Sequence, residues 1–194
     1  MKTIVVIGAM CLIFNAIHPI QAQNESKKNI AGFGSTYVPY LKHGMYFDDP
    51  FDFFPNQEPS VFIRLFYARK LNETLRLGSY LEAAAMNEFT DQSGDSPHSF
   101  SKQTIGIDWV SRYPETKLHL ELGGYFGYSF LKANNWANLK GIDFGMLAGP
   151  AYETKHFGVS VMIKAGFAPY FSSGTPEGIL LYAPGMLFQV YGKF

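Results

Sequence analysis

The stretch Leu118–Phe130, LHLELGGYFGYSF, alternates large apolar residues with polar residues and glycines. One set of alternate positions holds Leu118, Leu120, Leu122, Phe126, Tyr128 and Phe130, and the other holds His119, Glu121, Gly123, Tyr125, Gly127 and Ser129. Successive side chains of a β-strand point to opposite faces, so a period of two indicates a strand. The stretch therefore predicts a strand with one bulky, uncharged face and one face that collects charges and glycines.

Eight segments of the chain carry this alternation. They are residues 29–40, 59–71, 74–88, 100–113, 117–131, 139–153, 157–170 and 179–194. From the second segment onward the central apolar positions are free of charge, whereas the first segment, NIAGFGSTYVPY, does not reveal its faces. Pro39, Pro150, Pro169 and Pro184 fall within or near segment ends. We expect β-bulges there, because proline lacks the N–H that a strand ladder needs.

The composition indicates a surface that does not face water everywhere. Charged residues make up 16% of the 194 residues, against roughly 25% in typical soluble proteins, and aromatic residues also make up 16%. The net charge of +0 offers no basic field for nucleic acid. The longest uncharged stretch beyond the N-terminal segment, Gly178–Gly192, has 15 residues, fewer than the roughly 20 that a membrane helix needs. A chain of this kind that spans a membrane must do so as a closed β-barrel.

The bulky faces are predicted to point outward into lipid. An eight-stranded barrel has an interior just wide enough for side chains to fill, which suits glycines and linked polar groups. The connections also alternate in length: Asn72–Glu73, Pro114–Thr116 and Thr154–His156 are short, whereas residues 41–58, 89–99, 132–138 and 171–178 are longer. Outer-membrane barrels have short periplasmic turns and longer external loops. Both patterns predict an all-β fold, an eight-stranded antiparallel up-and-down transmembrane β-barrel; a soluble, lipocalin-like secreted barrel is the alternative.

The N-terminus has the layout of a secretory signal peptide. Lys2 precedes an uncharged stretch from Thr3 to Ile17, and small and polar residues follow at Gln21–Gln23. We expect cleavage after Ala22, which leaves residues 23–194 as the barrel domain. The single cysteine, Cys11, lies within the predicted signal peptide, so the mature chain is expected to have no disulfide and no thiol chemistry.

The end of the chain, MLFQVYGKF, alternates up to its last residue. Met186, Phe188, Val190, Gly192 and Phe194 share one face. With this ending the chain resembles the small eight-stranded outer-membrane barrels of Gram-negative bacteria, the OmpA/OmpX type. In that family the barrel-assembly machinery recognises a terminal Phe, usually with an aromatic residue third from the end. Here Gly192 stands at that place and Tyr191 lies one position off, so the resemblance assigns the assembly signal to Phe188, Val190, Tyr191 and Phe194.

The resemblance also implies a location and a set of partners. It implies a porin-like monomer in the outer membrane, in contact with lipid and lipopolysaccharide and handled by the barrel-assembly machinery during biogenesis. Neither a cofactor nor a metal site is expected, and the external ligand is unknown. The resemblance favours a non-enzymatic protein that contributes to the cell envelope and makes surface contacts through its external loops.

Ten polar residues fall on the predicted inward faces. They are Arg64, Arg76, Glu82, Lys102, Asp108, Arg112, His119, Glu121, Asp143 and Lys164. A three-residue hairpin loop at 72–74 would set Arg64 opposite Glu82, and a two-residue turn at 115–116 would set Arg112 opposite His119. Buried charges must neutralise one another, because removing water from an unpaired ion is expensive. The set is interpreted as a structural plug or, alternatively, as a gated narrow pore or proton path.

An enzyme is the other interpretation of these residues. Some eight-stranded outer-membrane barrels are lipid A deacylases or acyltransferases that combine Ser with His and an acid, and His119, Glu121 and Ser129 are the candidates here. Ser129 lies ten residues along the strand from His119, which is roughly 30 Å at about 3.3 Å per residue. No catalytic set is therefore assigned.

The first long connection is unusually rich in carboxylates and aromatic rings. It contains Phe47, Asp48, Asp49, Phe51, Asp52, Phe53 and Phe54. The carboxylates could bind Ca²⁺, but no EF-hand spacing is present. The rings could form a contact patch for a partner or part of an aromatic girdle. These interpretations stay open from the sequence.

Overall fold

The computed structural model describes residues 28–39, 42–45, 54–55, 60–89, 98–114, 116–133, 139–171, 178–182 and 184–194. The predicted signal peptide, residues 1–22, lies outside these residues. Among the described residues, no helix is long and apolar enough to cross a membrane.

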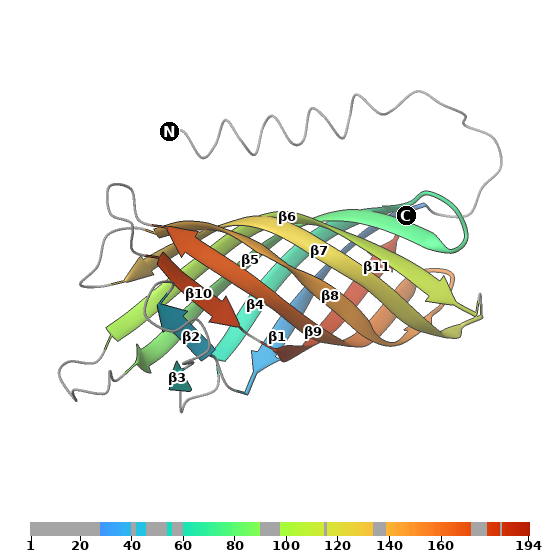
Figure 1. Cartoon of the computed structure of the whole chain (residues 1–194). Coiled ribbons are helices and arrows are strands. Elements are labelled where there is room, and N and C mark those ends of the chain that lie inside the picture. Colours follow the sequence, from blue (N-terminus) through green and yellow to red (C-terminus); the bar gives the residue numbers. More distant parts are fainter. Residues whose placement is uncertain are drawn as a thin grey trace, which may run out of the picture.

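All the described strands belong to one antiparallel sheet. They are β1 (Asn29–Val38), β2 (Lys42–Met45), β3 (Phe54–Pro55), β4 (Ser60–Lys70), β5 (Leu75–Phe89), β6 (His98–Tyr113), β7 (Leu118–Ala133), β8 (Leu139–Glu153), β9 (Phe157–Phe171), β10 (Gly178–Tyr182) and β11 (Gly185–Lys193). From β4 to β9 each strand pairs with the next in the chain. β11 pairs with both β9 and β1, and β1 pairs with β4, which closes the barrel (Figure 1).

The eleven labelled strands make up the eight strands of the barrel, because some barrel strands consist of two labelled parts. We call each complete strand of the barrel wall a stave. β10 and β11 pair with β9 in one register, in which Tyr182 lies opposite Phe167 and Gly185 opposite Lys164. They are two parts of the last stave, interrupted at Pro184 because proline cannot donate to the ladder. β1 pairs with β11 and β2 pairs with β10, so β2 continues the first stave beyond β1. β3 pairs with β2 and continues the stave of β4. The predicted eight-stranded antiparallel up-and-down barrel is confirmed.

The prediction of bulges at the prolines is wrong for β8 and β9. Lys140 lies opposite Phe171 and Ala151 opposite Ser160, so the register is the same on both sides of Pro150 and Pro169. Backbone pairing between β8 and β9 is interrupted at both prolines, because each removes an N–H without adding a residue. Register shifts do occur elsewhere in the sheet. One lies between β5 and β6, between Met86 and Phe89. Another lies between the first and last barrel strands, near Pro39 and Pro184, because Tyr37 is opposite Met186 whereas Lys42 is opposite Tyr182.

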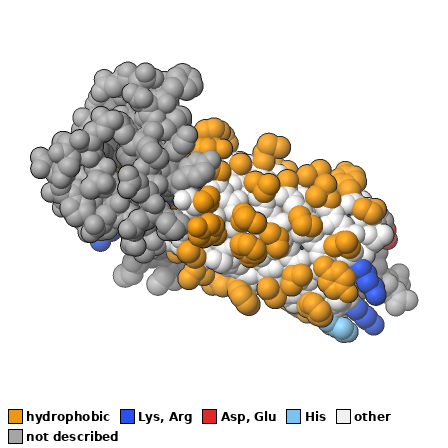
Figure 2. All heavy atoms as spheres, turned by 90° about the horizontal axis from the view of Figure 1, so that it is seen from below, with side chains coloured by type: hydrophobic (Ala, Val, Ile, Leu, Met, Phe, Trp, Pro, Cys, Tyr) orange, Lys and Arg blue, Asp and Glu red, His pale blue; other side chains and the backbone are white. Residues whose placement is uncertain are grey.

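The predicted direction of the side chains is also confirmed. Leu120, Ile107 and Val161 are 43%, 38% and 36% exposed, whereas Glu82 and Lys164 are 2% and 4% exposed. Apolar side chains cover the visible wall of the barrel, and cations gather at one of its ends (Figure 2). The structure also assigns the first stave: Ile30, Thr36 and Val38 are buried inside, and Phe33 and Tyr37 face outward.

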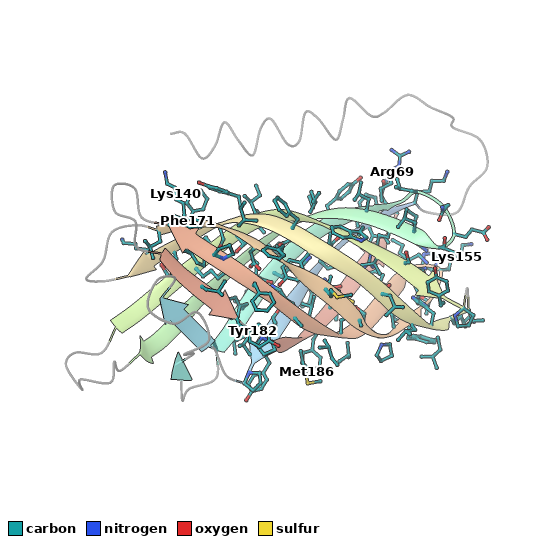
Figure 3. The ribbon with its side chains drawn as sticks, in the orientation of Figure 1. Arg69, Lys140, Lys155, Phe171, Tyr182 and Met186 are labelled. Carbon is teal, nitrogen blue, oxygen red and sulfur yellow. The ribbon has the colours of Figure 1, made fainter. Side chains whose placement is uncertain are left out.

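The outer wall forms an uncharged belt. Among the strand residues whose side chains the structure describes, the outward-facing charged ones are Arg69, Lys132 and Lys140, and all three lie at or next to strand ends. Arg69 and Lys140 mark opposite ends of the barrel (Figure 3). Charges at the ends can reach the polar interfaces, whereas a Lys or Arg near the middle of the belt would cost about 2–4 kcal/mol.

Inward-facing glycines make room for buried tyrosine rings. A Cβ atom on Gly158 would lie 2.4 Å from the ring of Tyr191, and one on Gly166 would lie 2.1 Å from the hydroxyl of Tyr125. Both tyrosines are 2% exposed. The glycines thus allow large rings to cross the narrow interior, which helps to fill it.

Candidate functional site

The ten polar residues predicted to face inward are all buried inside the barrel, with exposures of 7% or less. They come from β4, β5, β6, β7, β8 and β9, so most of the wall contributes to the cluster. No group of three or more His, Cys, Asp or Glu side chains suited to a metal ion occurs among the described residues. The charged residues among these ten form ion pairs with one another.

The central layer joins opposite walls of the barrel. Arg64 of β4 lies opposite Glu82 of β5, as predicted, with Nη1 3.8 Å from Oε2. Arg64 Nη2 also donates to Asp108 on β6. Lys164 of β9 donates to Glu82 Oε1, and β9 is four staves from β5 in the closed sheet. The Lys164–Glu82 bond therefore bridges the full width of the interior.

A neighbouring pair completes this layer. Lys102 Nζ on β6 donates to Asp143 Oδ2 on β8 at 2.5 Å. The guanidinium carbon of Arg64 lies 3.7 Å from the centre of the Tyr80 ring, a cation–π contact. A cavity of about 10 Å³ adjoins Lys102, Asp143 and Lys164, which is room for about one water molecule. This part of the barrel is packed with side chains.

A second layer lies nearer the end with the short turns. Glu121 Oε2 is 3.5 Å from Arg76 Nη2, and Glu121 Oε1 is 3.8 Å from Arg112 Nε and 3.5 Å from His119 Nε2. The predicted pairing of Arg112 with His119 is wrong, because Arg112 lies opposite Glu121. The reason is the turn: four residues, 114–117, separate β6 from β7, rather than the two assumed from the sequence.

Sequence reasoning missed one member of the cluster, Glu153, the last residue of β8. Both of its carboxylate oxygens accept hydrogen bonds from Arg112, and Oε2 also lies 2.9 Å from Lys70 Nζ and 3.1 Å from Lys193 Nζ. The sequence could have indicated Glu153, because it lies an even number of positions from Asp143 and therefore faces the same side of β8.

Among the residues whose side chains the structure describes, the buried charges balance once Glu153 is included. Five cations (Arg64, Arg76, Lys102, Arg112 and Lys164) match five carboxylates (Glu82, Asp108, Glu121, Asp143 and Glu153). We call these ten residues the ionic plug. Balance matters because a desolvated charge without a counterion is strongly destabilising.

A solved structure decides the fold class. The crystal structure of Neisserial surface protein A matches this chain with a TM-score of 0.60 and 12% identity, over 88% of this chain and 100% of that one. The chain has the fold of the small outer-membrane β-barrels. The uncharged outer belt is the kind of surface that such a barrel presents to the hydrocarbon of a membrane.

Two further solved structures resemble the chain more distantly. OprG from Pseudomonas aeruginosa matches with a TM-score of 0.49 and 11% identity, over 91% of this chain and 99% of that one. Ail from Yersinia pestis matches with a TM-score of 0.41 and 12% identity, over 84% and 99%. No protein-family model matches the sequence. No curated protein sequence matches it either.

The candidate hydrolase residues are not brought together. Ser129 Oγ lies 2.6 Å from the Tyr170 hydroxyl and 2.9 Å from Thr104 Oγ1, and it donates to the carbonyl oxygen of Gln103 at 3.4 Å, so its described partners are hydroxyl groups and a backbone carbonyl. His119 lies at the opposite end of β7, with Nδ1 3.0 Å from the carbonyl oxygen of Thr116. A serine without a nearby base lacks the activation that nucleophilic catalysis requires.

The four residues assigned to the assembly signal divide between two faces. Phe188, Val190 and Phe194 are 45%, 44% and 59% exposed on the outer wall, and Tyr191 is buried inside. The backbone N–H of Phe194 donates to the carbonyl oxygen of Asn29 at 3.0 Å, so the last residue takes part in closing the barrel. Of the aromatic and acidic loop residues, 47–53 lie outside the described residues and Phe54 begins β3.

Proposed function

We propose that this protein is a non-enzymatic outer-membrane barrel with a plugged interior, which contributes to envelope structure and makes surface contacts through its external loops. The observation that carries the proposal is the charge-balanced ionic plug. A side-chain-filled interior supports a structural role rather than a transport role.

The plug opposes an open channel for an energetic reason. An ion moving along the axis would have to separate bridges such as Lys164–Glu82 and Lys102–Asp143. Breaking a buried pair so that one charge loses its partner costs on the order of 3–5 kcal/mol. Thermal motion alone would rarely supply this for several pairs together.

The arrangement of the strand ends supports a contact role at one end. The turns at 71–74, 114–117 and 154–156 join neighbouring strands at the end where the last residue lies (Figure 1). The longer connections, such as 90–97 between β5 and β6, join strand ends at the other. In outer-membrane barrels the longer connections face outside. We infer that they supply the surface that meets lipopolysaccharide and an external partner.

We also infer that residues 1–22 are removed on export, so that the mature protein is a monomeric barrel of residues 23–194. The intact mass of protein purified from outer membranes tests this inference. A mass that includes residues 1–22 would exclude cleavage, and light scattering in detergent reports the oligomeric state.

Two measurements test the function. Purified protein in planar lipid bilayers is expected to show no stepwise conductance, with an open porin as the positive control; discrete channels would overturn the plugged interior. Lipid A mass spectra are expected to be unchanged by deletion and by overexpression of the protein. A loss or gain of an acyl chain would overturn the non-enzymatic assignment.

A further inference from the structure

A basic vestibule lies at the end of the barrel with the short turns. It has a volume of about 600 Å³, within the range of small-molecule pockets. Its cationic lining residues are Lys28, Lys70, Arg112, Lys117 and Lys193, and its acidic ones are Glu73 and Glu153. We call this space the lysine vestibule. The described lining residues carry three more cations than carboxylates.

Lys70 and Lys193 of the vestibule occupy those alternate positions of their strands whose side chains point into the barrel. Lys70 continues the buried series Phe66 and Ala68, and Lys193 continues Leu187 and Tyr191. Arg69, the neighbour of Lys70, instead points away from the barrel (Figure 3). The cations are thus directed around the mouth of the barrel rather than toward the surrounding lipid.

The floor of the vestibule concentrates positive charge. Glu153 Oε2 is shared by Lys70 Nζ at 2.9 Å and Lys193 Nζ at 3.1 Å, while Arg112 holds both oxygens of the same carboxylate. Three cations therefore surround one carboxylate. Like charges at this spacing repel one another, and an added anion relieves the repulsion.

We propose that the lysine vestibule binds a soluble, compact dianion from the periplasm, such as a phosphate monoester. Two negative charges match the local excess at Glu153, and lysine ammonium groups bind phosphate as point charges. The volume leaves room for a small organic group attached to the phosphate. The concave basic wall also raises the local concentration of anions.

Binding of inorganic phosphate and glycerol phosphate to the full barrel tests the proposal. The barrel is purified from outer membranes into a non-ionic detergent, and calorimetry is performed at low salt. Lys117→Gln removes a vestibule cation and Glu73→Gln removes a vestibule carboxylate; both residues are exposed, so folding is expected to be unaffected. Lys155→Gln is the matched control, because Lys155 is an exposed lysine in a turn at the same end but outside the vestibule lining.

The expected result is saturable binding that the three variants change differently. In water at low salt, one charge 4–6 Å from a dianion changes its affinity about ten- to thirtyfold, so Lys117→Gln weakens binding by up to that factor and Glu73→Gln strengthens it by a similar one. Lys155→Gln leaves the affinity unchanged. Equal weakening by Lys117→Gln and Lys155→Gln, or no saturable binding at millimolar phosphate, would overturn the proposal.

The source of the phosphate is tested by changing the lipid. The same titration is run in nanodiscs of phosphatidylcholine and in nanodiscs that contain phosphatidylglycerol. Binding of a soluble dianion is expected to have the same affinity in both. Loss of glycerol phosphate binding in the anionic nanodiscs would show that lipid headgroups occupy the vestibule, and the soluble ligand would be wrong.

Discussion

Lys164 and Glu82 stand on opposite walls of the barrel, on β9 and β5, and the hydrogen bond between them crosses the interior. Glu82 also faces Arg64, which in turn binds Asp108. The bridge therefore belongs to a network rather than to an isolated pair. Removing one member leaves several buried charges out of balance.

The first prediction concerns this bridge. Glu82→Gln is expected to lower the free energy of unfolding by about 3–5 kcal/mol, because Lys164 and Arg64 lose a desolvated counterion. The double variant Glu82→Gln, Lys164→Met restores the balance of charge and is expected to recover part of the loss. Urea unfolding of the barrel in lipid vesicles measures both. Lys140→Gln, on the outer wall, is the control; a double variant as unstable as the sum of its single variants would contradict the network.

A second prediction concerns the outer belt. Val161→Arg places a charge on an outward-facing residue of β9 in the lipid belt and is expected to cost about 2–4 kcal/mol. Leu118→Arg also faces outward but lies at the first residue of β7, where about 0–1 kcal/mol is expected. The same unfolding measurement compares them. Equal costs at the two positions would argue against a lipid belt centred on the strands.

The sequence predicts the architecture because two regular patterns reflect it: the alternation of side chains along each strand and the alternation of short and long connections between strands. Alternation with a period of two identifies the inward and outward faces, and the lengths of the connections identify the two ends. Arg64 and Glu82 could be paired in advance because a short hairpin loop fixes their register. The pairing of Arg112 with Glu121 could not be predicted, because the turn after Tyr113 has four residues and the sequence suggested a turn of two.

The alternation of residues along each strand does not predict which side chains meet across the interior of the barrel. The approach of Tyr191 to Gly158 depends on how neighbouring staves stagger and curve. Glu153 was overlooked because it is the last residue of its strand, although parity with Asp143 marks it as inward. Its three cationic partners come from β4, β6 and β11, a combination that only the closed barrel creates.

The third prediction uses this contact between a glycine and a ring. Gly158→Ala is expected to destabilise the barrel by about 1–3 kcal/mol, because the new methyl group would overlap the ring of Tyr191. Tyr191→Leu shortens that side chain, so Gly158→Ala should cost less in its presence. A double-mutant cycle by urea unfolding gives the coupling. Strict additivity would show that the ring does not determine the need for glycine.

The last prediction concerns the end of the chain. Phe194→Ser is expected to reduce the amount of folded barrel in the outer membrane, since the terminal aromatic residue is the proposed assembly signal and Phe194 also pairs with Asn29. Phe157→Ser is the matched control, because Phe157 is an outward-facing aromatic residue at the same end, 51% exposed against 59% for Phe194. Heat-modifiable migration on gels measures the folded fraction, because folded barrels resist detergent until they are heated. Refolding of each purified variant into vesicles separates recognition from stability: Phe194→Ser should refold as well as Phe157→Ser in vitro and still fail in cells. Equal loss in both settings would assign Phe194 to stability alone.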